Sequence, residues 1–203
     1  MKSSELFDLE GITFKNFIEK YPNLYDVLPN IHDYILEIGN TLNDDYYKLK
    51  DNVWIHKSVQ MGEGVEIIGP AIVMENAKLR HNAYLRENVI VGKNSVIGNS
   101  CEIKNSILID SCEVPHFNYV GDSIMGRHAH LGAGVIISNL RLDKANIRIN
   151  KIDTGLRKIG AFIGDNVQIG CNSVICPGSI IYPNIVVLPL TLYKNNNVEV
   201  KRI

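Results

Sequence analysis

The sequence predicts an all-β fold in which short strands coil into a three-sided parallel prism, and three observations predict it. One aliphatic side chain returns every six residues between Ile55 and Ile109. A smaller side chain lies two residues before most of these positions, so both point to the same side of an extended strand. The residue before the smaller one is mostly Asn, Gly or Ser, which tolerates a tight corner. Strand, corner and a period of six are typical of a hexapeptide β-helix.

The ladder of aliphatic residues is long enough to define a coil. Its members are Ile55, Met61, Ile67, Val73, Leu79, Leu85, Val91, Ile97, Ile103 and Ile109. Their partners are Val59, Val65, Ala71, Ala77, Ala83, Val89, Ser95, Cys101 and Ile107. An amphipathic helix would instead repeat its apolar face at three and four residues. Because three strands make one coil, the complete ladder predicts about six coils.

Two interruptions divide the ladder. After Ile109 it continues at Tyr119, Met125, Leu131 and Ile137, and it resumes at Ile163, Ile169, Ile175, Ile181 and Val187. The long step from Ile109 to Tyr119 predicts a four-residue insertion that contains His116. Residues 138–158 are polar and rich in Asn, Lys and Arg. A loop of this length in a compact domain indicates a functional lid or an arm that grips another subunit.

The two ends of the chain lie outside the repeat. Apolar residues at helical spacing between Phe14 and Tyr21 predict one helix, and a second is expected to begin with Asn30 as its cap and to end at Gly39. We therefore expect a helical cap over residues 1–50, a β-helix over 51–190 with an inserted loop at 138–158, and a tail over 191–203. The cap is expected to cover the open end of the β-helix or to pack on its flank. A role for these helices in holding a partner stays open.

Composition narrows the class of protein. The net charge of −1 gives no basic surface typical of nucleic-acid binding, and no apolar run is long enough to span a membrane. The four cysteines form no CxxC pair, which favours reduced thiols. We expect a soluble cytoplasmic protein.

Arg86 and Lys104 are the first candidate site residues. They are eighteen residues apart, and each follows an inward position, so both should point outward on one face in adjacent coils. Two stacked cations suit a phosphate, since arginine offers a planar fork and lysine a point charge. The alternative is that both are ordinary solvated surface charges.

Histidines are the next candidates. His116 can accept a proton near neutral pH, and a bulged position would bring it to the surface, but a purely structural histidine is the alternative. The spacing of His128 and His130 suits a metal, yet no Asp, Glu or Cys nearby completes a ligand set. We therefore expect no metal. The sequence also contains no phosphate-binding GxxxxGK[ST] loop and no GxSxG element.

Three segments resemble a known family. They are His116-Phe-Asn-Tyr119-Val-Gly121-Asp122, His130-Leu-Gly132-Ala-Gly134 and Ser138-Asn139-Leu-Arg. These resemble the acetyltransferase domain of bifunctional glucosamine-1-phosphate acetyltransferase/N-acetylglucosamine-1-phosphate uridylyltransferases. Residues 153–165 are similar to the C-terminal β-helix of archaeal-type bifunctional sugar-1-phosphate nucleotidyltransferases, and also to short bacterial relatives of UDP-N-acetylglucosamine pyrophosphorylase. The resemblance covers residues 52–190 and implies a left-handed β-helix.

The resemblance also implies roles for individual residues. His116 falls on the catalytic base and Tyr119 on a tyrosine that contacts the substrate. The pair Arg86 and Lys104 falls on the phosphate-binding arginine and lysine, which share its spacing. The substrate-contacting residues of the long loop fall on Asn139 and Lys144. The acyl-CoA and oxyanion side falls on Gly132, Ala133, Gly134 and Cys171.

Two residues depart from the family pattern. His130 replaces an asparagine, and Cys171 replaces a serine on the thioester side. Either change implies a different sugar, a different acyl group or weakened catalysis.

The implied activity is N-acetylation of an amino-sugar 1-phosphate, of the glucosamine or galactosamine 1-phosphate type, with acetyl-CoA as co-substrate and without a metal. The implied assembly is a homotrimer with active sites between subunits. A catalytically inactive β-helix module that assembles or regulates a separate sugar nucleotidyltransferase is the alternative. Nucleotidyl transfer by this chain itself is not expected, because its sequence shows no phosphate-cradling loop and no metal-binding pair of carboxylates.

Overall fold

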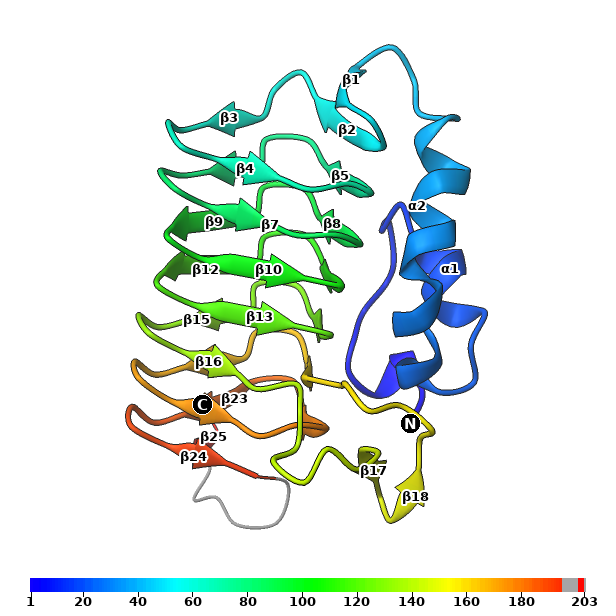
Figure 1. Ribbon diagram of the computed structural model, residues 1–203. Coiled ribbons are helices and arrows are strands. Elements are labelled where there is room, and N and C mark those ends of the chain that lie inside the picture. The colour runs from blue at the N-terminus through cyan, green and yellow to red at the C-terminus, as the bar shows by residue number, and fades with distance from the viewer. Residues whose placement is uncertain (195–200, 203) are drawn as a thin grey trace.

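The chain forms a three-sided parallel β-solenoid with helices along one side. The structure is a computed structural model that describes residues 1–194 and 201–202. Of the predicted tail, residues 195–200 and 203 lie outside the described residues. Figure 1 shows the coils stacked in chain order, with α1 and α2 standing beside them. Within the described residues, no helix combines the length and apolar composition needed to cross a bilayer.

Each side of the prism is one sheet, and the three sheets hold eight, eight and seven strands. Because each coil contributes one strand to each sheet, the prism has more coils than the six predicted. Sheet A contains β1 (Tyr46–Lys50), β2 (Val53–His56), β5 (Ala71–Val73), β8 (Val89–Val91), β11 (Ser106–Leu108), β14 (Ile124–Met125), β19 (Ala161–Ile163) and β22 (Ser179–Ile181). Sheet B contains β3 (Gln60–Met61), β6 (Lys78–Leu79), β9 (Val96–Asn99), β12 (Glu113–His116), β15 (His130–Leu131), β20 (Gln168–Ile169), β23 (Ile185–Val187) and β25 (Lys201–Arg202). Sheet C contains β4 (Glu66–Ile67), β7 (Tyr84–Leu85), β10 (Glu102–Lys104), β13 (Tyr119–Gly121), β16 (Ile136–Ile137), β21 (Val174–Ile175) and β24 (Leu192–Tyr193). Neighbouring strands are parallel except at the two ends, where β1 and β25 pair antiparallel.

The predicted ladder forms the interior core as far as Ile103. Its members are buried except Met61, which is 40% exposed in the first coil. The predicted corners are also present, since residues such as Asn76, Asn82 and Asn94 have positive φ angles of 56–58°. Asparagine reaches this left-handed region more readily than most residues, which explains its recurrence at the corners.

Beyond Ile103 the ladder shortens, so the predicted four-residue insertion is wrong. The next interior residue is Leu108, which pairs with Val91, whereas Ile109 lies outside the prism among the helices. Val120, and not Tyr119, is the interior residue of β13, in register with Ile103. This coil therefore has seventeen residues.

The shorter coil changes the setting of His116. This histidine ends the regular strand β12 and pairs with Asn99 of the preceding coil. It does not lie in a bulge. The side chains at 108 and 109 are both aliphatic, so the six-residue period alone selected the wrong one.

The helices pack on the flank of the prism, not over its end. They are α1 (Lys15–Glu19) and α2 (Ile31–Gly39), with one-turn 3₁₀ helices at Ser3–Glu5, Leu24–Asp26 and Leu28–Asn30. The buried face of α2 repeats at four residues through Ile31, Ile35 and Gly39. At Gly39 a Cβ atom would approach the Trp54 ring to 2.6 Å, so only glycine permits this packing distance. The predicted cap at Asn30 is absent, since its side-chain amide donates to the Asp26 carbonyl instead.

Sheet A accepts the helices because it is apolar on both sides. Its outward residues stack in register as Trp54, Ile72, Ile90, Ile107, Ile124, Phe162 and Ile180. All are buried in a second apolar core together with the helices. The inserted loop joins this core through Ile147, Ile149 and Ile159, and it contains the antiparallel hairpin β17 (Arg148–Ile149) and β18 (Ile152–Asp153).

A column of charges that alternate in sign lines the corner between sheets A and B. It runs Glu75, Lys93, Asp110, Arg127, Asp165, one residue from each coil. The Lys93 ammonium lies 3.2 Å from the Glu75 carboxylate. Carboxylates also accept backbone N–H groups from the neighbouring coil, as Asp110 does from Lys93 at 2.9 Å and Asp165 from Arg127 at 2.7 Å.

Removing a side chain from the second core should cost much more than removing the same side chain from the surface. We expect Phe162→Ala to lower the free energy of unfolding by about 3–5 kcal/mol, because Phe162 is fully buried and its loss leaves a cavity in the second core. Urea denaturation followed by circular dichroism measures this change. Phe117→Ala is the matched control, since Phe117 is 60% exposed, and a change of less than about 0.5 kcal/mol is expected. Equal losses in both variants would contradict the packing described.

Candidate functional site

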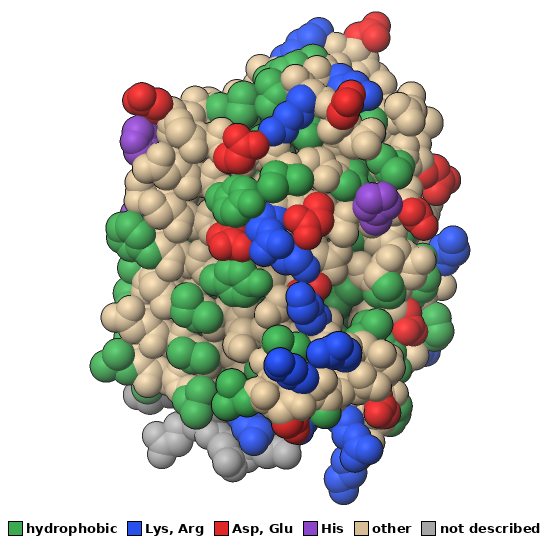
Figure 2. Space-filling model, in the orientation of Figure 1, with side chains coloured by type: hydrophobic (Ala, Val, Ile, Leu, Met, Phe, Trp, Pro, Cys, Tyr) green, Lys and Arg blue, Asp and Glu red, His purple; other side chains and the backbone are tan. Residues whose placement is uncertain are grey.

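Arg86 and Lys104 lie next to each other on the outer face of sheet C. Register pairs Leu85 with Ile103, and the Arg86 N–H donates to the Ile103 carbonyl at 2.8 Å. The two cations therefore occupy equivalent positions in successive coils. In Figure 2, Lys and Arg side chains gather along the middle of this face.

Both cations are already held by carboxylates. The Arg86 guanidinium lies 3.2 Å from the Glu102 carboxylate and 3.6 Å from that of Glu87. The Lys104 ammonium, whose side chain is only 14% exposed, lies 3.7 Å from Asp122. Arginine has five N–H donors in all, so these contacts orient the fork and leave donors for a ligand.

Asp122 is the centre of this cluster, and sequence reasoning did not select it. Its side chain is buried and accepts a hydrogen bond from the Asn105 amide at 2.9 Å. Its second oxygen accepts from the amide of Asn139, the first side chain of the inserted loop to reach the cluster. One carboxylate thus holds Lys104, Asn105 and Asn139 together. The sequence does contain a signal that could have identified Asp122, since this residue follows directly after Tyr119-Val-Gly.

Tyr119 points outward beside this aspartate. Its hydroxyl accepts a hydrogen bond from the Asn139 amide at 3.2 Å. Burial raises the pKa of Tyr119, and the negative charges of Asp122 and Glu102 raise it further. The phenol is therefore protonated at neutral pH and has an O–H to donate to a ligand.

His116 stands across the corner from Tyr119. Its side chain is exposed, and the buried Asn118 fixes its backbone by accepting the His116 N–H at 3.0 Å. The same asparagine donates to the Gly132 carbonyl at 2.7 Å. Asn118 was not selected from the sequence, yet it connects the histidine to the predicted acyl side.

On that acyl side, most backbone donors are occupied. The Gly132 N–H donates to Ile169 and the Gly134 N–H to the carbonyl of His116. Ala133 alone of these three residues has an N–H without a partner among the described residues. Cys171 stacks beside Gly132 and is exposed.

The remaining predicted residues lie apart from the cluster. Lys144 is exposed in a turn closed by its N–H to the Arg141 carbonyl, and no contact with Tyr119 is found in the described part of the chain. His130 lies 3.9 Å from the Glu113 carboxylate on sheet B, and a hollow of about 300 Å³ there is also lined by His128 and Gln168. Within residues 1–194, no three His, Cys, Asp or Glu side chains are arranged to hold a metal.

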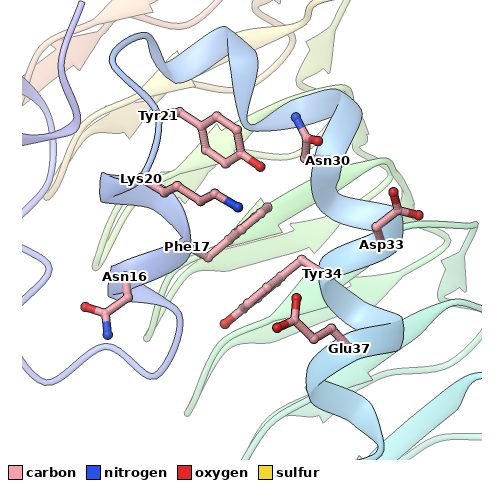
Figure 3. A pocket seen from close by; sticks show the side chains of 8 residues that line it. All are labelled: Asn16, Phe17, Lys20, Tyr21, Asn30, Asp33, Tyr34 and Glu37. Carbon is pink, nitrogen blue, oxygen red and sulfur yellow. The ribbon is translucent and has the colours of Figure 1, made fainter.

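A hollow of about 380 Å³ lies between α1 and α2 (Figure 3). Phe17 and Tyr34 stack at its centre with ring centroids 3.9 Å apart. Burial, helped by Glu37, raises the pKa of Tyr34 to about 12. Its walls combine one lysine with Asp33, Glu37 and two amides, a set that shows no catalytic arrangement.

Comparison with known proteins connects these features to one family. The profile of the family described as "GMPPB C-terminal domain" matches residues 67–186, more than half of the chain. The bifunctional sugar-1-phosphate nucleotidylyltransferase/acetyltransferase of Sulfurisphaera tokodaii is 40% identical over 98 residues, covering 43% of this chain and 24% of that protein. The bifunctional protein GlmU of Methanococcus maripaludis is 42% identical over 83 residues, covering 39% and 20%. The chain thus spans about a quarter or less of the length of these relatives.

Solved structures share the fold. A Bacillus cereus protein provisionally described as an acetyltransferase superposes with a TM-score of 0.54 at 25% identity, covering 69% of this chain and 74% of that one. A hexapeptide transferase family protein from Anaplasma phagocytophilum superposes with a TM-score of 0.51 at 16% identity, covering 68% and 76%. The predicted hexapeptide-repeat fold is confirmed.

The charge of Asp122 should be measurable through Tyr119. We expect Asp122→Asn to lower the pKa of Tyr119, because a negative charge beside a phenol opposes its ionisation. Carbon NMR of ring-labelled tyrosine, titrated to high pH and assigned with Tyr119→Phe, follows that group alone. Asp143→Asn removes the same charge from the exposed loop and should leave the titration of Tyr119 in place. An unchanged pKa in Asp122→Asn would rule out the electrostatic contact.

Proposed function

Since this chain belongs to the family of the GMPPB C-terminal domain, we propose that it transfers the acetyl group of acetyl-CoA to the amine of an amino-sugar 1-phosphate. The Sulfurisphaera tokodaii relative is named as a bifunctional sugar-1-phosphate nucleotidylyltransferase/acetyltransferase, and the Methanococcus maripaludis relative is named as a bifunctional protein, GlmU. The glucosamine and galactosamine 1-phosphates are the substrates of the expected type. The reaction is expected to occur in the cytoplasm and to require no metal.

The observation that carries the proposal is the cluster around Asp122. It holds one ammonium and two amides beside the Arg86 guanidinium and a protonated phenol. Cationic and hydroxyl donors on a fixed wall suit the phosphate and hydroxyl groups of a sugar phosphate. The sugar amine would then face His116 across the corner.

The chemistry is a direct acyl transfer. The amine nitrogen attacks the thioester carbonyl carbon, a C–N bond forms, and the C–S bond breaks to release the CoA thiolate. His116 takes the proton that the amine loses and returns it to the leaving sulfur. Such base catalysis contributes about 10²–10⁴-fold to the rate.

The developing oxyanion needs a donor that is not already in use. The N–H groups of Gly132 and Gly134 are engaged between coils, so the proposal narrows to the N–H of Ala133. One such donor is typically worth about 10²–10³-fold in kcat. Cys171 would lie against the thioester.

The exposure of His116 on a flat sheet favours a site completed by another copy of the chain. An enzyme must exclude water from the thioester, and one prism offers only a wall. We therefore extend the proposal to a homotrimer with sites between its subunits, in which Lys144 of the exposed loop reaches the substrate.

One observation favours the alternative, a catalytically inactive β-helix module that assembles or regulates a separate sugar nucleotidyltransferase: His130 and Cys171 depart from the family pattern. Incubation with acetyl-CoA and each amino-sugar 1-phosphate, with free thiol as readout, separates the two. Absence of thiol release with every sugar would favour the inactive module.

Loss of the base should lower turnover with little change in binding. We expect His116→Ala to reduce kcat by about 10²–10⁴-fold, because the amine then keeps its proton as it attacks. Thiol release under saturating substrates measures kcat. His81→Ala removes an exposed histidine elsewhere on the prism and should retain wild-type kcat. Equal rates for His116→Ala and wild type would exclude the assigned base.

Removal of the Arg86 guanidinium should weaken the binding of one substrate only. We expect Arg86→Ala to raise the KM for the sugar phosphate at least about tenfold and to leave the KM for acetyl-CoA within about twofold, because charged hydrogen bonds to the phosphate are removed. Arg80→Ala, an exposed arginine six residues earlier, should change neither constant. A parallel rise in both constants would count against the phosphate assignment.

A further inference from the structure

The inserted loop has an excess of positive charge that the chain as a whole does not have. Residues 138–158 contain six cations, Arg141, Lys144, Arg148, Lys151, Arg157 and Lys158, against Asp143 and Asp153. The chain as a whole has a net charge of −1. All six cations are exposed, and among the described residues only Arg141 forms an ion pair, with Asp143.

The loop is folded on an apolar base. Ile147, Ile149 and Ile159 are at most 3% exposed and pack into the core shared by the helices and sheet A. Backbone hydrogen bonds close it internally, with the N–H of Ile147 on the Leu156 carbonyl at 2.8 Å. These three side chains point into the molecule, whereas Leu142 and Ile152 are exposed together with the cations.

This surface begins at the candidate site. Asn139, near the start of the loop, contacts Tyr119 and Asp122, and the N–H of Ile159 at its far end donates to the Asn139 carbonyl at 3.0 Å. Figure 2 shows Lys and Arg side chains in a band that continues from the middle of the sheet C face down over the lower part of the molecule. A hollow of about 270 Å³ in the loop is lined by Arg141, Arg148 and Asn146, together with Asp153.

The charge balance of the two regions differs. Around Arg86 and Lys104, two cations meet the three carboxylates of Glu87, Glu102 and Asp122. That cluster therefore has no surplus of positive charge. The loop, by contrast, has four more cations than carboxylates and no carboxylates elsewhere in the described residues that pair with them.

We propose that the basic surface of residues 138–158 binds a diphosphate group, carried either by a nucleotide-linked sugar or by the nucleotide end of acetyl-CoA. Two adjacent phosphates present several oxygens along a line, which matches arginine forks spread along a hairpin better than a single phosphate does. The inference rests on the proposed acyl transfer for its biological meaning. Because its test measures binding and needs no turnover, the diphosphate site and the proposed acyl transfer can fail separately.

The probes are inorganic pyrophosphate and orthophosphate, titrated calorimetrically into the full-length protein at low salt. We expect pyrophosphate to bind at least about tenfold more tightly than orthophosphate, because more charged hydrogen bonds form. The variant Arg148→Gln with Lys151→Gln, both exposed on the hairpin, should weaken pyrophosphate binding at least about tenfold. Far-ultraviolet circular dichroism verifies that the variant is folded.

The matched control removes two exposed cations from sheet B. Lys78→Gln with Arg80→Gln should leave pyrophosphate binding within about twofold, since those residues lie on another side of the prism. If pyrophosphate binds no more tightly than orthophosphate, or if the control loses as much affinity as the loop variant, the diphosphate site is overturned.

A second pair of titrations identifies the source of the diphosphate. UDP stands for a nucleotide-linked sugar, and CoA stands for the acyl donor. Selective weakening of UDP by the loop variant assigns the surface to a nucleotide-linked sugar, and selective weakening of CoA assigns it to the acyl donor. Unchanged affinity for both would overturn the proposal, whatever pyrophosphate alone does.

Discussion

The fold depends on the hydrogen bonds that join each coil to the next. For these bonds to form, the chain must turn at a corner after each side of the prism. The corner residue often has a positive φ angle, as Asn76, Asn82 and Asn94 do. With corners fixed, residues one coil apart meet in register. That register brings Arg86 against Lys104 and lets Asp122 receive groups from neighbouring coils. A site of this kind is a property of the stacking, since no single segment contains it.

The second organising feature is that sheet A is apolar on both sides. Its outer face binds the helices, and the same core continues beneath the inserted loop through Ile147 and Ile149. The loop therefore has one end in a buried core and the other in the polar cluster through Asn139. This arrangement makes the position of the Asn139 amide, which we propose contacts the substrate, depend on packing on another side of the prism.

Sequence reasoning succeeded where a period of six determines the structure. It failed at Leu108 and Ile109, because either aliphatic residue satisfies the period and only the strand partners separate them. The flank position of the helices had a signal that was not used: Trp54, Ile72 and Ile90 recur at the eighteen-residue spacing of one coil. The role of Asp122 could not be predicted from the spacing of residues along the sequence, because its partners come from other coils and from the loop.

The alternating charges at the corner of sheets A and B have a consequence for assembly of the prism. Repeated coils resemble one another, so a folding chain can omit one and stack the next in its place. Because the signs alternate through Glu75, Lys93, Asp110, Arg127 and Asp165, omitting any single internal coil brings two like charges together. The omission of Lys93, for example, would place Glu75 against Asp110. The column therefore disfavours a stack that is one coil short, because electrostatic repulsion between the two like charges would raise the free energy of that stack.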